Sequence, residues 1–224
     1  MSTPFLRQAA GIAAKDLRSE LRSGEVLFVT IPFGAVALLL IPLAVGTDLA
    51  LLERIGPGLY WVVVLLFGLL VTQRQSAVDR PPQRDLLRLL GVDPAAGFAG
   101  RVAAGTVLLL AFEALVGTVM LVLYDPDLTG WPWLAAILPL TAWGLALLGT
   151  LTDSVTAGLS SRATLTPLLV APLAIPLLLA ATQALEGLRL GTGILSWVLL
   201  LVVMDLVLAI TGVLAARPLE EAIG

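Results

Sequence analysis

The chain has 224 residues, of which 58% are hydrophobic and only 13% are charged, and its formal net charge is −3. It contains no cysteine and no histidine. This excludes disulfides and thiol chemistry, and it removes the commonest transition-metal ligand and the usual proton carrier near neutral pH. Six long apolar stretches use most of the length, so we expect an all-α membrane protein with little room for a soluble catalytic domain.

Residues 4–22 precede the first apolar stretch. Apolar side chains recur there at three- and four-residue spacing, while basic side chains gather on another face. This pattern predicts an N-terminal amphipathic interfacial helix lying along the inner membrane surface. The charged residues expected to hold it there are Lys15, Asp16, Arg18 and Arg22.

The apolar stretches predict six transmembrane helices, because about 20 apolar residues cross the hydrocarbon layer. The second stretch is short, and we expect its helix to continue through residues 73–78. The fifth contains Pro167, Pro172 and Pro176, which predict a kinked or broken helix. With the interfacial helix, we expect these helices to form one transmembrane domain over residues 1–224. Their predicted bounds are 26–45, 57–72, 103–124, 133–151, 163–184 and 194–216.

Basic residues lie almost entirely on one side of the predicted helices. If the N-terminus is inside, only Arg54 and Arg189 of the 13 basic residues lie outside. The positive-inside rule therefore predicts that both termini are cytoplasmic.

The cytoplasmic segment 79–94 follows the second transmembrane helix. Asp79-Arg80-Pro81-Pro82 ends that helix, and residues 84–90 predict a short helix with basic and leucine-rich faces. Asp93, followed by proline, is expected to cap the next helix. One interpretation is a solvated loop, and the other is a coupling helix that docks into a cytoplasmic partner. The coupling residues would be Arg80, Arg84, Asp85, Leu87, Arg88 and Leu90.

Two acids, Glu113 and Asp205, fall at the centres of the third and sixth predicted helices. A charge at that depth costs about 2.5–3.5 kcal/mol on insertion scales, so neither should face lipid ionised. They either make hydrogen bonds between helices, with threonines as the expected partners, or belong to a conduction path or proton relay. A proton-coupled carrier is disfavoured because the membrane segments contain few other ionisable groups.

An interfacial helix, six spans and a docking loop give the layout of an ABC-2-type permease, and the chain resembles the CcmB family, the haem exporter protein B subunits of the cytochrome c maturation system. One departure lies at 79–87 (DRPPQRDLL), where the family usually has Asp-Gly and then Leu-Glu. The stretches that carry the resemblance are 14–22 (AKDLRSELR), 147–151 (LLGTL) with 157–159 (AGL) and Arg162, and 168–176 (LLVAPLAIP).

The resemblance implies a permease subunit that is not itself an enzyme. It also implies a location in the bacterial inner membrane. The expected partners are a second copy of the chain, a cytoplasmic ABC ATPase, a haem-handling membrane subunit and a small membrane subunit. ATP would bind the partner, because the chain lacks a G-x-x-x-x-G-K-[ST] loop. Haem would be cargo and not a bound cofactor, and no metal site, catalytic residue or nucleic-acid partner is expected.

Within that resemblance, the outer aromatic residues Trp61, Trp131 and Trp133 either set the membrane depth or stack on porphyrin. Two alternative functions stay open. The chain could be an ABC-2 permease for a lipid, polysaccharide or drug, or a scaffold of the maturation complex that transports nothing and transmits ATPase motion.

Overall fold

The computed structural model describes residues 4–46, 48–78, 89, 91–126, 130–156 and 162–223. This part of the chain is helical, and its helices are joined by short connections. In order they are α1 (Phe5–Ser23), a π-helical turn (Val26–Thr30) that runs into α2 (Ile31–Val45), α3 (Leu49–Val78), α5 (Pro94–Tyr124), a 3-10 turn (Trp131–Trp133), α6 (Leu134–Thr156), α7 (Arg162–Leu190) and α8 (Leu195–Ile223).

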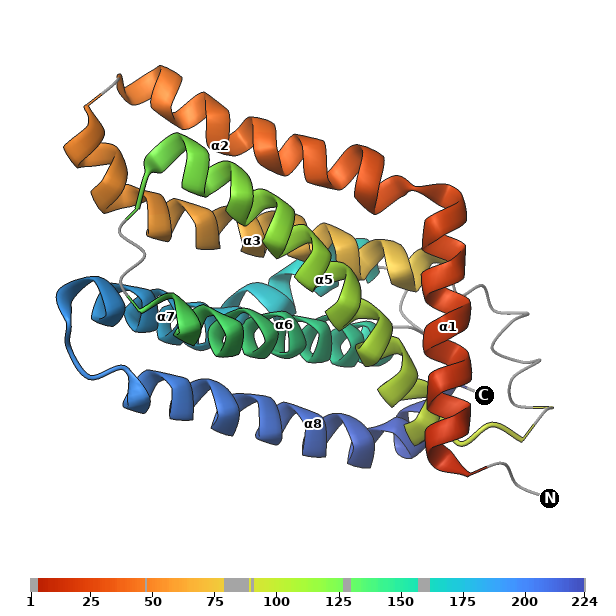
Figure 1. The fold of residues 1–224 in the computed structure, drawn as a ribbon. Helices are drawn as coiled ribbons and strands as arrows, with labels where there is room; N and C mark the ends of the chain where they lie inside the picture. The colour runs from red at the N-terminus through yellow and green to blue at the C-terminus, as the bar shows by residue number, and fades with distance from the viewer. Residues whose placement is uncertain are drawn as a thin grey trace.

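Six helices of the described part are long and apolar enough to cross a membrane, which confirms the predicted all-α, six-span fold. Figure 1 shows these helices as an elongated bundle, with α1 lying across one end of it. The marks for both chain termini lie at that same end. An even number of crossings places the termini on one side of the bundle.

Helices α3, α5, α6, α7 and α8 all extend beyond their predicted bounds, and two of them, α3 and α7, run through prolines. Helix α3 begins at Leu49 and passes through Pro57, a region that we had assigned to an outer loop up to residue 56. Helix α7 is unbroken through Pro172 and Pro176 and ends at Leu190, so the expectation of a broken helix was wrong. The physical reason is that unpaired backbone groups are costly in lipid, so the chain keeps every helical bond that proline allows.

The carbonyl that Pro42 leaves without a helical donor is satisfied from another helix. Pro42 has no N–H, so it cannot bond the carbonyl of Leu38 one turn earlier. The hydroxyl of Tyr124, at the end of α5, donates to that carbonyl oxygen over 2.8 Å. Tyr124 and Leu38 are both fully buried, so this bond replaces water where none is available.

A sharp corner joins α1 to the first transmembrane helix. Gly24 adopts the left-handed conformation with φ 64° and ends α1, and its N–H donates to the Glu20 carbonyl. The Glu20 carboxylate then accepts the N–H of Val26 over 2.6 Å, capping the start of the next helix. The role of Glu20 was not predicted from the sequence.

Helix α1 packs closely on the first turns of α5. Ile12 is the buried residue of α1, and Gly100 of α5 lies against it. A Cβ on Gly100 would come within 2.6 Å of the Ala9 carbonyl oxygen and 2.8 Å of the Ile12 Cβ. Leu6 and Leu21, two apolar residues of the same helix, are 78% and 72% exposed. Packing on α5 therefore uses Ile12 and leaves those leucines available to a membrane.

Replacing Gly100 with alanine tests this packing. We expect G100A to lower the free energy of unfolding by about 1–3 kcal/mol, because the new methyl group overlaps the backbone of α1. The matched control is G97A, one turn earlier on α5, where the nearest atom to a Cβ is Ile12 Cδ1 at 4.0 Å. Thermal unfolding of the purified protein in detergent measures both. Equal stability of the two variants would contradict this contact.

Candidate functional site

Three helices meet at Asp93, at the end of the bundle where α1 lies. The backbone N–H of Asp93 donates to Oε1 of Gln8 in α1 over 2.9 Å. Its Oδ1 accepts the Ala95 N–H over 2.9 Å and caps α5 as predicted. Its Oδ2 accepts from Nη2 of Arg217 in α8 over 2.9 Å. We call Gln8, Asp93 and Arg217 the Asp93 junction, which ties α1, α5 and α8 together.

Electrostatics favour the ionised form of Asp93. The hydrogen bond from Arg217 is the largest cause, and the bond from the Ala95 amide follows; together they hold the pKa of the carboxyl below its ordinary value. The side chains are partly exposed, 67% for Arg217 and 33% for Asp93, so the ion pair alone stabilises the fold modestly. Its importance is that it links helices distant in the chain.

The predicted coupling segment leads directly into this junction. Arg80, Arg84, Asp85, Leu87, Arg88 and Leu90 all lie outside the described residues. Within the segment, Leu89 is 85% exposed, and Gly91 turns the chain with φ 69° just before Asp93. Sequence analysis identified Asp93 as a cap but missed Gln8 and Arg217. The sequence signal that could have found them is their position, since Gln8 and Arg217 are polar residues near the predicted cytoplasmic ends of their helices.

The charged residues predicted on α1 lie as a surface helix requires. Lys15, Arg18 and Arg22 are exposed, and Asp16 is half-buried. Lys15 Nζ pairs with Asp16 Oδ1 at 3.0 Å. The basic side chains therefore face outward, and their contact with anionic headgroups stays a prediction.

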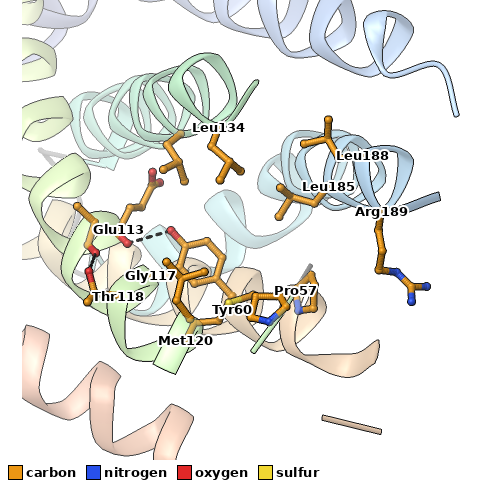
Figure 2. A pocket seen from close by; sticks show the side chains of 14 residues that line it. Pro57, Tyr60, Glu113, Gly117, Thr118, Met120, Leu134, Leu185, Leu188 and Arg189 are labelled. Atoms are coloured by element: carbon orange, nitrogen blue, oxygen red, sulfur yellow. Dashed lines mark hydrogen bonds between the residues drawn. The ribbon is translucent and has the colours of Figure 1, made fainter. Parts of the chain in front are cut away.

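Glu113 lies on the wall of a cavity toward the opposite end of the bundle. The cavity has a volume of about 180 Å³ and lies between α3, α5, α6 and α7 (Figure 2). Glu113 is completely buried, and neither carboxyl oxygen has a hydrogen-bond partner in the described part of the chain. The hydroxyl of Tyr60 donates to the backbone carbonyl of Glu113 over 3.1 Å, not to its carboxyl.

Asp205 is also completely buried, and within the described residues its carboxyl oxygens have no hydrogen-bond partner. Its Oδ1 lies so close to Gly144 of α6 that a Cβ there would collide with it. The hydrogen bonds between helices that we expected for the two acids are therefore not found in the described part. The threonines donate to carbonyls of their own helices instead; these bonds run from Thr106 to Val102, from Thr118 to Ala114 and from Thr141 to Ile137, each over 2.8 Å.

The predicted outer aromatic contacts are only partly accessible. Trp61 is 1% exposed and packs edge-on against Tyr60 with ring centroids 4.9 Å apart, so its ring is enclosed by the protein. Trp133 is 40% exposed, and the side chain of Trp131 lies outside the described residues. Sequence position did not predict the side of α3 from which Trp61 projects.

Six helices long and apolar enough to cross a membrane indicate a multi-pass membrane protein. The model of the CcmB protein family matches residues 7–220, and the chain belongs to this family. Its sequence is similar to proteins named heme exporter protein B. It is 34% identical to that of Paracoccus denitrificans (strain Pd 1222), where 77% of this chain and 79% of the relative are covered.

Other relatives carry the same name. The protein of Bradyrhizobium diazoefficiens is 30% identical over 81% of this chain and 82% of its own length. The protein of Pseudomonas aeruginosa is 30% identical over 88% of this chain and 90% of its own length. The similarity therefore extends over nearly the whole chain and over nearly the whole of these relatives.

The charge on Asp93 gives a pH-dependent prediction. Asp93→Asn keeps a capping side chain but removes the ion pair with Arg217. Because the folded-state pKa is lowered, the pair adds stability above the ordinary carboxyl pKa of about 3.9 and loses it as the pH falls through the lowered value. We expect the variant to be less stable by at most about 1 kcal/mol at neutral pH, with no difference once wild-type Asp93 is protonated.

Thermal unfolding of both proteins across an acid titration measures this difference. Asp48→Asn is the matched control, since the Asp48 carboxylate also accepts an amide at a helix start, from Leu51. A D93N deficit that stays constant into strong acid would contradict the ion-pair account.

Proposed function

We propose that this protein is the membrane permease subunit of an ATP-driven haem-export system of cytochrome c maturation. A separate ATPase subunit would hydrolyse ATP, and this chain would convert the resulting motion into haem delivery, or release of a haem-loaded chaperone, on the outer side. The observation that carries the proposal is the family match over residues 7–220, together with relatives named heme exporter protein B.

Charge supports a location and an orientation. We place the chain in the bacterial inner membrane with both termini and α1 on the cytoplasmic side. Arg54 and Arg189 belong to the end of the bundle opposite α1, while the other basic residues fall on the cytoplasmic side of this topology. The positive-inside rule favours that arrangement over its inverse.

The Asp93 junction supports a route for the motion. In this proposal the ATPase contacts the segment 79–94 through the basic and leucine side chains predicted there. Movement of the segment pulls on Asp93, which is bonded to Gln8 of α1 and to Arg217 of α8. Helices are stiff along their axes, so a shift at this end would reach the opposite end of the bundle through α5 and α8.

The remaining parts of the complex follow the family resemblance. We propose a homodimer of this chain with a pair of ATPase subunits, joined by a haem-handling membrane subunit and a small membrane subunit. The need for an outside ATPase rests on the sequence, because its single lysine, Lys15, lies between Ala14 and Asp16 and not in a phosphate-binding loop.

One observation favours the scaffold alternative for the haem step. The cavity beside Glu113 holds about 180 Å³, below the roughly 300–1,000 Å³ of pockets that enclose drug-sized ligands. A porphyrin does not fit it in this conformation. Under this alternative the chain transmits ATPase motion to a haem-handling partner without passing haem itself, and haem transport by reconstituted vesicles separates the two.

A charge-reversal variant tests the coupling segment. Arg84→Glu with Arg88→Glu should reduce recovery of the ATPase subunit with this chain in mild detergent by about tenfold or more, because both charges on the docking face are reversed. Quantitative mass spectrometry of the affinity-purified complex measures the ratio of the two proteins.

The matched control is Arg54→Glu, the same change at the end opposite α1, which should leave ATPase recovery unchanged. Thermal unfolding of each variant checks that the spans remain folded. Recovery of the ATPase at the wild-type ratio with the double variant would contradict the proposed coupling role.

A further inference from the structure

The cavity beside Glu113 combines an apolar wall with one buried acid. Its lining includes Tyr60, Gly117, Leu134, Leu185 and Leu188, from all four surrounding helices (Figure 2). Glu113 belongs to the same wall, and its two carboxyl oxygens are fully buried and have no hydrogen-bond partner among the described residues. Leaving such a group unpaired costs free energy comparable to a lost hydrogen bond or more. Neither the fold nor the proposed export function explains why the chain bears this cost.

The other polar groups of the cavity are already engaged. The Tyr60 hydroxyl donates to the Glu113 carbonyl, and the Thr118 hydroxyl donates to the Ala114 carbonyl over 2.8 Å. Arg189 pairs with Glu186, with its Nε 3.1 Å from Oε2, and Figure 2 shows its guanidinium pointing away from Glu113. The carboxyl of Glu113 is thus the group on this wall that can still receive a partner.

Charge around the cavity favours a cation as that partner. The end of the bundle where the cavity lies carries Asp48, Glu53, Asp125 and Glu186 among the described residues, against Arg54 and Arg189. The apolar stretches that surround Glu113 contain no lysine or arginine. The excess of acidic residues at this end of the bundle concentrates cations. An ammonium group offers several N–H donors to the two Glu113 oxygens, which have no partner among the described residues.

The volume limits the apolar part of the ligand. A dry cavity of about 150 Å³ accepts benzene, so about 180 Å³ accepts a single substituted ring or a short alkyl chain. We propose that this cavity binds a small cationic amphiphile, whose ammonium group pairs with Glu113 and whose apolar body fills the space between α3, α5, α6 and α7. This site is independent of the proposed haem export, since it needs no partner subunit.

Equilibrium binding to the full chain in lipid nanodiscs tests the site. The probe is 2-phenylethylamine, and its neutral match is 2-phenylethanol; empty nanodiscs correct for partition into lipid. We expect saturable binding of the amine and about tenfold or weaker binding of the alcohol, because the alcohol cannot form the ion pair.

Three variants locate the binding. Glu113→Gln should weaken amine binding by about tenfold or more, while Asp205→Asn, the other buried acid, should leave it unchanged. Gly117→Leu adds side-chain volume to the cavity lining and keeps the Glu113 carboxyl, and a Cβ there has ordinary contacts of 3.7 Å to Tyr60; it should also abolish saturable binding. This variant decides the question if E113Q does not fold.

The proposal is overturned if wild-type protein shows no saturable amine binding, if the alcohol binds as tightly as the amine, or if Gly117→Leu binds the amine like the wild type. Haem export activity is not a readout in any arm. Failure of this site would therefore leave the proposed function standing, and failure of the ATPase test would leave this site standing.

Discussion

The need to pair every backbone donor and acceptor inside a bilayer governs this structure. A helix meets that need alone, so the chain is helical wherever it crosses. Proline is the exception, and its consequences are visible: Pro42 frees the Leu38 carbonyl, and the Tyr124 hydroxyl donates to it from α5. Helices α3 and α7 also contain prolines, and both helices continue past them. The bundle thus consists of stiff helices, and the Asp93 junction links three of them near their ends.

The two ends of the bundle carry different chemistry. At the α1 end, a charged and hydrogen-bonded junction at Asp93 joins α1, α5 and α8. Toward the other end, an apolar cavity reaches the buried Glu113 (Figure 2). Close helix contacts through glycine, such as Gly100 against Ala9 and Ile12, connect the helices along their sides. In the proposed function, a shift at one end would reach the other, because packed interiors shift between arrangements and do not compress.

Much of this architecture follows from the order of residues. Hydropathy predicted the six spans, and Asp93-Pro94 predicted the start of α5. Side-chain direction could not be predicted in the same way: Trp61 was expected at the outer surface, and its ring is buried in the core. The partners of Asp93 were missed because Gln8 and Arg217 are separated from it by 85 and 124 positions. Such contacts depend on how helices cross, which one sequence does not contain.

In the proposed function, motion enters this subunit at the Asp93 junction and spreads from there to α1 and α8. Because the chain has no native cysteine, Leu6→Cys on α1 and Leu214→Cys on α8, both at exposed positions, can be spin-labelled directly in the assembled complex. Pulsed electron paramagnetic resonance then gives the distance between the labels with and without ATP on the partner. The account predicts a nucleotide-dependent change of distance that is lost when Asp93 is replaced by asparagine. An unchanged distance in the wild-type complex, or transport by this chain with no ATPase present, would contradict it.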